Sequence, residues 1–323
     1  MAKKKIKVGV LFGGKSAEHE VSINSANNVI KALDETKYQI TPIKISKNGK
    51  FKFEVLKNFD VIFPVLHGPF GEDGSMQGLL KLAGVPYVGA GVLGSAVGMD
   101  KDIMKKLLRE AGIPIGEFLT LRSVKEMSFG EVKRKIGLPL FIKPANLGSS
   151  VGISKVKNES EWNTALENAF QYDSKVVVEE YIKGREIECA VLGNENPVAS
   201  IPGEVIVNSE FYSYEAKYID ENGASVQIPA KLPDDTVKKI KELAVKTFKT
   251  LNCEGLGRVD FFLKENGEIF VNEINTLPGF TNISMYPKLW EASGLPVSKL
   301  IDKLIELAME RFEKEQKLKT TVA

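Results

Sequence analysis

The N-terminal third of the sequence alternates between two periodicities, and this alternation constrains the fold more than any other feature. Residues 6–12 (IKVGVLF) form an apolar run typical of a buried strand, and apolar residues then recur at helical spacing over residues 18–33. Strand patterns follow at residues 38–45 and 60–67, and a helical pattern at residues 74–84 ends at a glycine. Strand, helix and strand in this order predict an α/β fold with a parallel sheet and right-handed crossovers.

The first strand pattern ends in a double glycine followed by carboxylates, in the stretch FGGKSAEHEVS at residues 12–22. A glycine turn after a strand can cradle a phosphate, but Glu18 and Glu20 would repel one. The turn is therefore predicted to bind something other than a phosphate. His67 ends the third strand pattern, and ligands of open α/β sheets bind at the carboxyl ends of the strands. We expect Glu18 and His67 to share one crevice, although a purely structural role for His67 stays open.

Composition and charge exclude several classes of function. The chain has 323 residues, of which 43% are hydrophobic and 27% charged, as in ordinary globular proteins. A formal net charge of +2 gives no reason to expect nucleic acid or a membrane surface as a partner. Cys189 and Cys253 lie in apolar sequence, so neither a disulfide framework nor a metal cluster is expected. Because no leader and no membrane-spanning stretch of ~20 apolar residues is evident, we expect a cytoplasmic protein.

The sequence pattern changes after residue 99, and we expect three lobes. Residues 1–99 would form an N-terminal α/β domain, residues 100–183 a central lobe and residues 184–323 a C-terminal lobe. Helical patterns occupy about residues 100–112, 158–170 and 233–251, and strand patterns occupy residues 138–144, 152–156, 175–182 and 186–193. A long polar and aromatic stretch at residues 208–225 is predicted to be a functional lid, because long loops inside compact domains usually have a function.

Two strand patterns in the third lobe, GRVDFFL and EIFVNEIN, flank the dipeptide Asn-Gly at residues 266–267. This dipeptide predicts a two-residue hairpin turn. The resulting register places Asp260 opposite Glu273 and Arg258 opposite Asn275, all on one face of the hairpin. Two opposed carboxylates are destabilising unless a cation lies between them, and carboxylate and amide oxygens are ligands that Mg²⁺ prefers. This face is therefore a candidate metal site.

An ordinary solvated hairpin face is the alternative to a metal site. The same register places Phe262, Ile269 and Val271 on the face that holds the acidic residues. Apolar neighbours predict that the face is partly covered, which favours the metal site over the alternative.

A basic strand end and a glycine-rich connector form a candidate phosphate site. Lys143 lies near the end of a strand pattern, and the connector ANLGSSVG follows at residues 145–152. Such a connector can bring backbone N–H groups close to an anion, although an ordinary turn is the alternative. Together with the acidic segment VEEYIKGRE at residues 178–186, these features describe a nucleotide held between two sheets. We do not expect a P-loop NTPase. A dinucleotide oxidoreductase is not expected either, since no G-x-G-x-x-G follows the first strand.

Eight segments resemble motifs of the D-alanine–D-alanine ligases, a family of the ATP-grasp superfamily. In chain order they are GGKSAEHEVS, HGPFGEDGSMQG, MDK, KPANLGSSVGISKV, EEYIKGREIECAVLG, FYSYEAKY, GRVDFFL and VNEINTLPGFT. The resemblance covers essentially the whole chain. It implies an ATP-grasp fold with an N-terminal parallel-sheet domain, and the joining of two D-alanines for peptidoglycan precursors. In that reaction ATP phosphorylates the carboxylate of one D-alanine, and the amine of the second attacks the acyl phosphate.

The resemblance also implies a nucleotide site with two divalent cations. The implied nucleotide-binding residues are Lys101, Lys143, Ser150, Glu179, Tyr181, Ile182, Glu186 and Lys217. Lys101 and Lys143 would contact the phosphates, and Glu186 would bind the ribose hydroxyls. Glu179 and the backbone of the two residues at 181 and 182 resemble the adenine-binding edge. The implied ligands of the two Mg²⁺ ions, for which Mn²⁺ can substitute, are Asp260, Glu273 and Asn275.

The amino-acid substrates are implied to bind at the N-terminal lobe and the lid. Glu18 would pair with the ammonium of the first D-alanine, which explains a carboxylate beside a glycine turn. Glu18, Ser149 and Tyr218 resemble a hydrogen-bonded triad that closes the site, and we expect Tyr218 also to set specificity for the second substrate.

The chemical step is implied to use Arg258 and the backbone N–H of Gly279, which would face the oxyanion of the tetrahedral intermediate. The groups implied around the second D-alanine are His67, Lys217, Ser284 and the N–H of Met285. The family also implies a homodimer.

Three alternative functions stay open at this stage. A ligase of the same type could use D-serine or D-lactate as the acceptor. Another ATP-grasp ligase, similar to biotin carboxylase or glutathione synthase, would share the nucleotide site but should lack the GGKSAEHEVS and EAKY elements together. A nucleotide-responsive regulatory protein would be expected to have lost Arg258 or a metal ligand.

Overall fold

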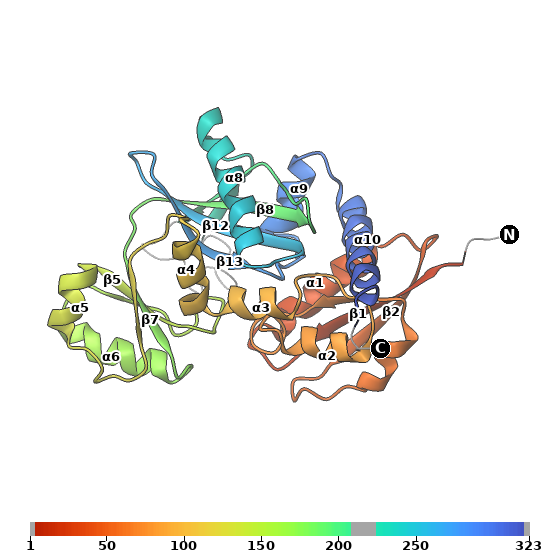
Figure 1. The fold of residues 1–323 in the computed structure, drawn as a ribbon, viewed down its shortest axis with the longest axis horizontal. Coiled ribbons are helices and arrows are strands. Elements are labelled where there is room, and N and C mark those ends of the chain that lie inside the picture. The colour runs from red at the N-terminus through yellow and green to blue at the C-terminus, as the bar shows by residue number, and fades with distance from the viewer. Residues whose placement is uncertain (1–3, 208–223, 320–323) are drawn as a thin grey trace.

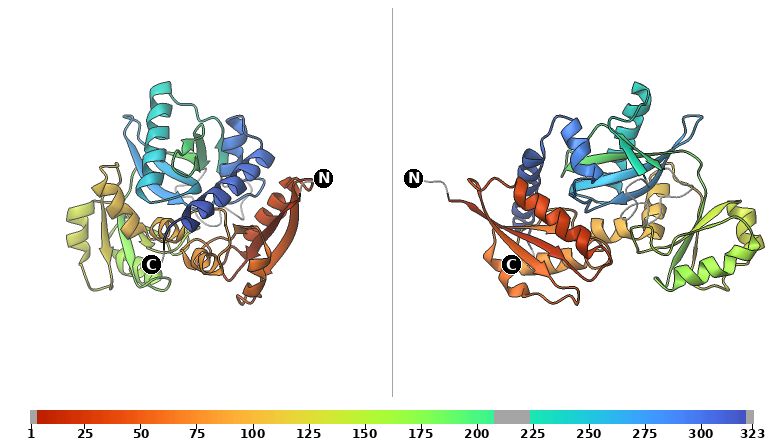
Figure 2. Two further views of the ribbon diagram at one scale, coloured as in Figure 1. Left: turned by 45° about the vertical axis from the view of Figure 1, so that its right-hand side comes forward. Right: turned by 180° about the vertical axis from the view of Figure 1, so that it is seen from behind.

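The structure is a computed structural model that describes residues 4–207 and 224–319. Within these residues the strands form three sheets, each built from consecutive strands of the chain. Figures 1 and 2 show the first and the middle sheet at opposite ends of the molecule, with the third sheet between them. The architecture is mixed α/β, as predicted. None of the helices in the described ranges is long and apolar enough to cross a membrane.

The first sheet is parallel and confirms the strand–helix–strand prediction. Its order is β2-β1-β3. The elements of this part are β1 (Ile6–Gly13), α1 (His19–Ala32), β2 (Tyr38–Ile45), the 3₁₀ helix η1 (Phe53–Asn58), β3 (Val61–Val65), α2 (Ser75–Ala83) and α3 (Val92–Met99). Sequence patterns do not predict α3, because the stretch VLGSAVGM lacks the polar face that gives a helical period.

Residues 9–16 (GVLFGGKS) have the letters of a phosphate loop, G-x-x-x-x-G-K-S, but not its structure. Residues 9–13 belong to β1, where Gly9 pairs with Thr41 of β2 and with Ile62 of β3. A strand that is hydrogen-bonded on both sides cannot wrap around a phosphate. This agrees with the expectation that the chain is not a P-loop NTPase.

The middle sheet is antiparallel, in the order β4-β7-β5-β6. The elements of this part are α4 (Lys101–Glu110), β4 (Phe118–Leu121), α5 (Phe129–Ile136), β5 (Leu140–Pro144), β6 (Ser154–Val156), α6 (Glu159–Phe170) and β7 (Val176–Glu180). Asp100 begins α4, since its side chain accepts the N–H of Ile103 at 3.1 Å. This cap places Lys101 in the first turn of the helix. Sequence patterns predict all of these elements except β4 and α5.

The third sheet is antiparallel, in the order β11-β10-β8-β12-β13, and β9 pairs with β8. The elements of this part are β8 (Arg185–Gly193), β9 (Val198–Ala199), β10 (Gly203–Val207), β11 (Ala224–Gln227), α8 (Asp234–Thr250), β12 (Gly255–Leu263), β13 (Ile269–Asn275), α9 (Met285–Ala292) and α10 (Val297–Gln316). Most of the predicted lid, including Lys217 and Tyr218, lies outside the described residues.

The hairpin of β12 and β13 has the predicted pairs but not the predicted turn. Asp260 lies opposite Glu273 and Arg258 opposite Asn275, as expected. The two-residue turn is wrong: Lys264 bonds across to the residue at 268, and the loop between them has Gly267 in the left-handed region (φ 85°). This longer loop moves the register by one residue, and a β-bulge beside Asp260 moves it back. The two deviations cancel at the acidic residues.

Because of the bulge, the face predicted for two apolar residues is wrong. Ile269 and Val271 do not share a face with the acidic residues, but lie in the buried cluster that β12 and β13 form with α8. Phe262 stays on the acidic face, half-buried, opposite Phe270. The acidic face is partly covered as expected, although by phenylalanines rather than by the predicted aliphatic residues.

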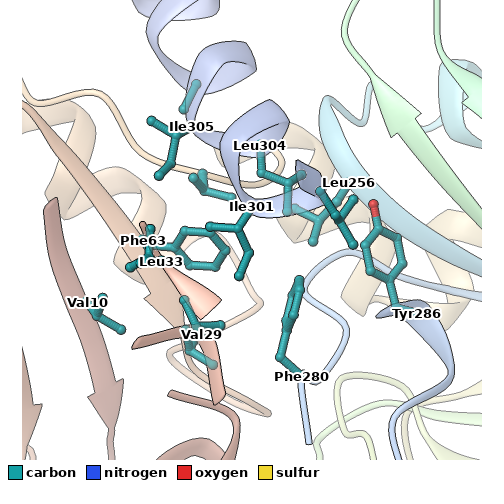
Figure 3. Packing of buried hydrophobic residues seen from close by; sticks show 14 of the residues in the cluster. Val10, Val29, Leu33, Phe63, Leu256, Phe280, Tyr286, Ile301, Leu304 and Ile305 are labelled. Atoms are coloured by element: carbon teal, nitrogen blue, oxygen red, sulfur yellow. The ribbon is translucent and has the colours of Figure 1, made fainter. Parts of the chain in front are cut away.

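One core joins the first sheet to the two C-terminal helices. Figure 3 shows residues of the first sheet and α1 facing residues of α10, with Phe280 and Tyr286 completing the cluster. The Phe280 ring packs edge-on against Phe63 with 5.9 Å between ring centroids, and the Tyr286 hydroxyl donates to the Val191 carbonyl at 3.1 Å. Each predicted lobe contains one sheet, but α10 packs against the first sheet as well as the third. The boundaries at residues 99 and 183 stay a prediction.

Candidate active site

A cleft of about 860 Å³ lies where the first sheet, the loop between β5 and β6, and the third sheet meet. It contains most of the residues singled out in the sequence. The predicted site residues that line it are Glu18, His67, Lys101, Ser149, Glu186, Arg258, Asp260, Glu273, Asn275, Gly279, Ser284 and Met285. The prediction that Glu18 and His67 share one crevice is confirmed.

The loop between β5 and β6 closes over the first sheet at Glu18. Ser149 Oγ donates a hydrogen bond to Glu18 Oε1, although 131 residues separate them in the chain. Ser149 and Ser150 have positive φ angles of 54° and 60°, a conformation that costs residues other than glycine about 1–2 kcal/mol each. Two members of the implied triad are therefore in contact, while the third, Tyr218, lies outside the described residues.

His67 is buried just after β3, at the base of the cleft. Its Nδ1 lies 3.3 Å from Glu72 Oε1, and Glu72 also accepts the N–H of Gly68 at 3.2 Å. Burial alone would lower the pKa of His67, but the hydrogen bond and charge of Glu72 outweigh burial and raise it. Within the described residues, His67 Nε2 makes no hydrogen bond of normal geometry, although the nearby Leu277 backbone also helps to raise the pKa of His67. A protonated His67 would present an N–H donor to an anionic group in the cleft.

Arg258 is held by two carboxylates on neighbouring strands. Its Nε and Nη2 each donate to one oxygen of Asp260, both at 2.7 Å, and Nε lies 2.8 Å from Glu188 Oε2. Burial would lower the pKa of Arg258, but these carboxylates raise it well above its ordinary value. Glu188 is not among the predicted residues. Its signal in the sequence is the alternation with Glu186 on β8, which places both side chains on one face.

Three carboxylates form a row across the third sheet. Glu188 of β8 pairs with Asp260 of β12, which pairs with Glu273 of β13. Lys101 Nζ lies 4.0 Å from Glu273 Oε2 and, together with Arg258, balances part of this negative charge. The row places acidic oxygens on the cleft face of three adjacent strands.

The predicted metal ligands fit a hard divalent cation by their chemistry. No group of three His, Cys, Asp or Glu side chains in the described ranges is arranged to hold a metal, so the candidate set depends on the amide oxygen of Asn275. Asn275 Oδ1 accepts the N–H of Leu277 at 3.0 Å, and both oxygens of Asp260 accept from Arg258. Each of these oxygens has a second lone pair, so the present bonds orient the ligands without saturating them.

Three lysines surround one carboxylate beside the cleft. Lys143 Nζ donates to Glu179 Oε2 at 2.7 Å, and Lys105 Nζ lies 3.5 Å from Glu179 Oε1. Lys101 Nζ donates to the Leu147 carbonyl at 2.7 Å, which ties the loop between β5 and β6 to α4. Lys105 was not predicted, because nothing in the sequence of α4 distinguishes it from the exposed lysine that follows it.

Several predicted nucleotide residues lie next to the cleft rather than in its lining. They are Lys143, Ser150, Glu179, Tyr181 and Ile182. All belong to the middle sheet or its loops. They are linked to the cleft through Lys101, which lines it and whose charge helps to lower the pKa of Glu179. The N–H of Tyr181 donates to the Pro139 carbonyl at 3.3 Å, so a ligand at this strand end would meet the Tyr181 carbonyl rather than its N–H.

The pKa of Glu179 leads us to expect a loss of folding stability in acid. Burial would raise its pKa, but Lys105 and Lys143 lower it to about 2 from an ordinary value of 4.5. A group with a lowered folded-state pKa contributes stability that is complete above the ordinary pKa and is lost as the pH falls toward the folded value.

We therefore expect the free energy of unfolding to decrease between about pH 4.5 and about pH 2, with Glu179 contributing up to about 3 kcal/mol of the change. Glu179→Gln should flatten the pH dependence in this window, whatever its effect at neutral pH. Urea unfolding at a series of pH values measures the slope. Equal slopes for the wild type and the variant would contradict the prediction.

Two family models match the chain. The model described as D-ala D-ala ligase C-terminus matches residues 107–306, and the one described as D-ala D-ala ligase N-terminus matches residues 7–56 and 52–90. The chain belongs to the D-alanine–D-alanine ligase family. The resemblance found in its motifs is thereby confirmed. The family models match most of the chain, and the stretch between the two matches, residues 91–106, contains α3 and the first part of α4 with Lys101.

Relatives in this family are similar over almost their whole length. The chain is 50% identical to the D-alanine–D-alanine ligase of Oceanobacillus iheyensis, over 98% of this chain and 99% of that protein. It is 49% identical to D-alanine–D-alanine ligase A of Salmonella typhimurium, over 98% and 100% of the two chains. Because these matches cover almost the whole of both chains, they place the whole chain, and not one domain of it, in the family.

Two solved structures share the fold. The D-alanine-D-alanine ligase from Coxiella burnetii has a TM-score of 0.86 and 40% identity, covering 98% of this chain and 97% of that one. The VanG D-Ala:D-Ser ligase from Enterococcus faecalis has a TM-score of 0.84 and 38% identity, covering 94% and 100%. The predicted ATP-grasp fold with an N-terminal parallel sheet is confirmed.

Proposed function

We propose that this chain joins two D-alanines to D-alanyl-D-alanine, with the conversion of ATP to ADP and phosphate, for peptidoglycan precursors. The main support is the single cleft in which Glu18 and Ser149, the Arg258 side chain and the row of carboxylates meet. This arrangement offers an anion for an ammonium at one end and cations for phosphates at the other. Its relatives of about 50% identity are D-alanine–D-alanine ligases.

In this proposal the first D-alanine binds by its ammonium to Glu18. The second binds by its carboxylate at the beginning of α9, near Ser284 and the N–H of Met285. The first N–H groups of a helix have no partner inside the helix and favour an anion. His67 supports this placement of the carboxylate. It lines the same cleft, and its buried Nε2 would donate a hydrogen bond to an anionic group if His67 is protonated. Lys217 would contribute from the lid.

The chemical step transfers the γ-phosphoryl group of ATP to the carboxylate of the first D-alanine, with ADP as the leaving group. The amine of the second D-alanine then attacks the acyl phosphate, loses a proton, and releases phosphate. Arg258 and the N–H of Gly279 would stabilise the tetrahedral oxyanion between these events. Gly279 suits close approach of a ligand, since a Cβ there would lie only 2.9 Å from Ser284 Oγ. Closure by Ser149, Ser150 and Tyr218 would exclude water, which would hydrolyse the acyl phosphate.

The nucleotide would lie between the middle and third sheets. Its phosphates would be contacted by Lys101, Lys143 and Ser150. Its adenine would be contacted by Glu179 and by the strand end at Tyr181 and Ile182, and its ribose by Glu186. Asp260, Glu273 and Asn275 would hold two Mg²⁺ ions, for which Mn²⁺ can substitute. Bound Mg²⁺ would neutralise phosphate charge during the transfer. We further propose that the enzyme works as a homodimer in the cytoplasm, where ATP is supplied.

A second candidate is the same reaction with D-serine as the acceptor. The likeness to a D-Ala:D-Ser ligase, at 38% identity, favours testing it. The lid residues proposed to contact the acceptor lie outside the described residues.

The test is ATP turnover by the purified chain with Mg²⁺ and a mixture of D-alanine, D-serine and D-lactate, with the products identified by mass spectrometry. We expect D-alanyl-D-alanine as the dominant product, with one ADP and one phosphate per bond formed. A dominant D-Ala-D-Ser or depsipeptide product would keep the mechanism but change the acceptor. Absence of D-alanine-dependent turnover would contradict the proposed function.

A further inference from the structure

Lys105 is a buried cation that the proposed reaction does not use. It follows Lys101 by one helical turn on α4, so the two side chains lie on the same face of the helix. Only 2% of Lys105 is exposed. Its Nζ lies 3.5 Å from Glu179 Oε1 and 5.9 Å from the centre of the Phe118 ring. Desolvation lowers the pKa of a buried lysine, as it does here, so such a residue needs a compensating partner. For Lys105 this partner is Glu179.

A different lysine lies at each oxygen of Glu179, one as a hydrogen bond and the other as an ion pair without hydrogen-bond geometry. Lys143 of β5 contacts Oε2 at 2.7 Å, and Lys105 of α4 contacts Oε1 at 3.5 Å. Glu179 itself is on the central strand β7, between β4 and β5, and only 5% of it is exposed. Glu273 also acts on both lysines through its charge, and Glu186 acts on Lys143. Because two lysines share the carboxylate of Glu179, one of them can turn toward the phosphates of a nucleotide without leaving this buried carboxylate without a cation.

The Lys143–Glu179 and Lys105–Glu179 ion pairs respond differently when a phosphate approaches Lys143. An ammonium that turns toward a phosphate weakens its bond to Glu179, because one group of donors is shared between two anions. Without a second cation, Glu179 would then be a buried carboxylate that had lost its nearest partner, which is strongly unfavourable. Lys105 approaches the other oxygen from a separate helix, so it can stay in contact with Glu179 while Lys143 moves.

We infer that Lys105 is a positioning residue of the nucleotide site: it holds Glu179 ionised and in place, and so leaves Lys143 available to the phosphates. This inference rests on the proposed function, because that function assigns Lys143 and Glu179 to the nucleotide.

The first test separates ATP from D-alanine. Lys105→Met keeps the apolar stem and removes the charge, whereas Lys105→Arg keeps a charge. For Lys105→Met we expect KM for ATP to increase about tenfold and KM for D-alanine to stay within about twofold. Lys105→Arg should recover most of the loss. Lys106→Met, on the same helix with a side chain that is 59% exposed, is the matched control and should leave both KM values within about twofold.

The second test measures protons taken up when ADP binds. In the wild type Glu179 faces Lys101, Lys105 and Lys143, and it should stay ionised when Lys143 turns toward ADP. In Lys105→Met only the more distant Lys101 would remain, so ADP binding should raise the pKa of Glu179 and take up a proton. Relative to the wild type, the ADP affinity of Lys105→Met should then increase about tenfold from about pH 8 to about pH 6. Calorimetric titration with ADP in buffers of different ionisation enthalpy measures this uptake.

Either of two results would overturn the inference. One is equal ADP affinity and equal proton uptake for the wild type and Lys105→Met. The other is an equal increase in both KM values, which is the result expected if Lys105 only supports the fold. If the methionine variant does not fold, Lys105→Gln takes its place in both measurements. A wild type that binds ADP without D-alanine-dependent turnover would contradict the proposed function alone, and the ADP titration would still decide the role of Lys105.

Discussion

Replacing Arg258 with methionine is expected to lower kcat by about 10³-fold, because the cleft would lose its guanidinium where negative charge develops. Arg258 is fixed in advance by Asp260 at 2.7 Å and by Glu188 at 2.8 Å, so it needs no reorganisation during the reaction. A donor held in this way stabilises the transition state more than the substrate. The effect should therefore be on kcat, with smaller changes in KM. ADP release in a coupled assay with saturating ATP and D-alanine measures it.

Arg185→Met is the matched control for this experiment. Arg185 also lies on the third sheet and also makes a two-pronged ion pair, with Glu204 at 2.8 and 2.6 Å, but it does not line the cleft. Its loss should leave kcat within about twofold. Arg258→Met also leaves Glu188 and Asp260 without their shared guanidinium, so its folding must be checked by thermal unfolding. A folded Arg258→Met with kcat within tenfold of the wild type would contradict the proposed role.

The second large effect is expected for Glu18→Gln, which should lower kcat/KM for D-alanine by about 10²-fold. Glutamine keeps the shape of the side chain and can still accept the hydrogen bond from Ser149, but it lacks the charge that would pair with an ammonium. Loss of one partner of a partly buried charge pair has an effect of this size. KM for ATP should change by less than about threefold, because the nucleotide is proposed to bind at the other sheets.

Glu20→Gln is the control for this second experiment. Glu20 lies two residues further along the chain, lines the same cleft, and forms an exposed ion pair with Lys47 at 3.0 Å. Its loss should leave kcat/KM for D-alanine within about twofold, since exposed ion pairs contribute little. If both variants lost activity equally, the cleft would respond to net charge alone, and the specific pairing assigned to Glu18 would be wrong.

Much of the fold could be predicted because its signals are local. The first two strands of the first sheet are short apolar runs separated by a helical period, and this strand–helix–strand pattern predicts a parallel sheet. The pairing of Asp260 with Glu273 also follows from strand alternation. The two-residue turn predicted for the same hairpin was wrong, and its bulge was not predicted, because a bulge depends on packing against α8 and has no fixed sequence signal.

Two of the residues that the sequence does not single out, Lys105 and Glu188, have partners that are distant in the chain. Lys105 differs from Lys106 only in the side of α4 that it occupies, and that side is decided by the middle sheet packed against it. Glu188 gains its role from Arg258 on the next strand. The role of Glu72 could not be predicted from charge patterning or periodicity, because it depends on the contact of Glu72 with the buried His67.

The sequence by itself determined most of the order of strands and helices, the family, and the residue types available for chemistry, because periodicity and motifs are properties of neighbouring residues. Only the tertiary structure decided which of those residues meet. Glu18 and Ser149 are 131 residues apart and share a hydrogen bond, and one of two adjacent lysines on α4 is buried against Glu179 while the other faces solvent. Burial and charge pairing depend on the packing of separate sheets, and that packing sets the pKa of Glu179 and the position of Arg258.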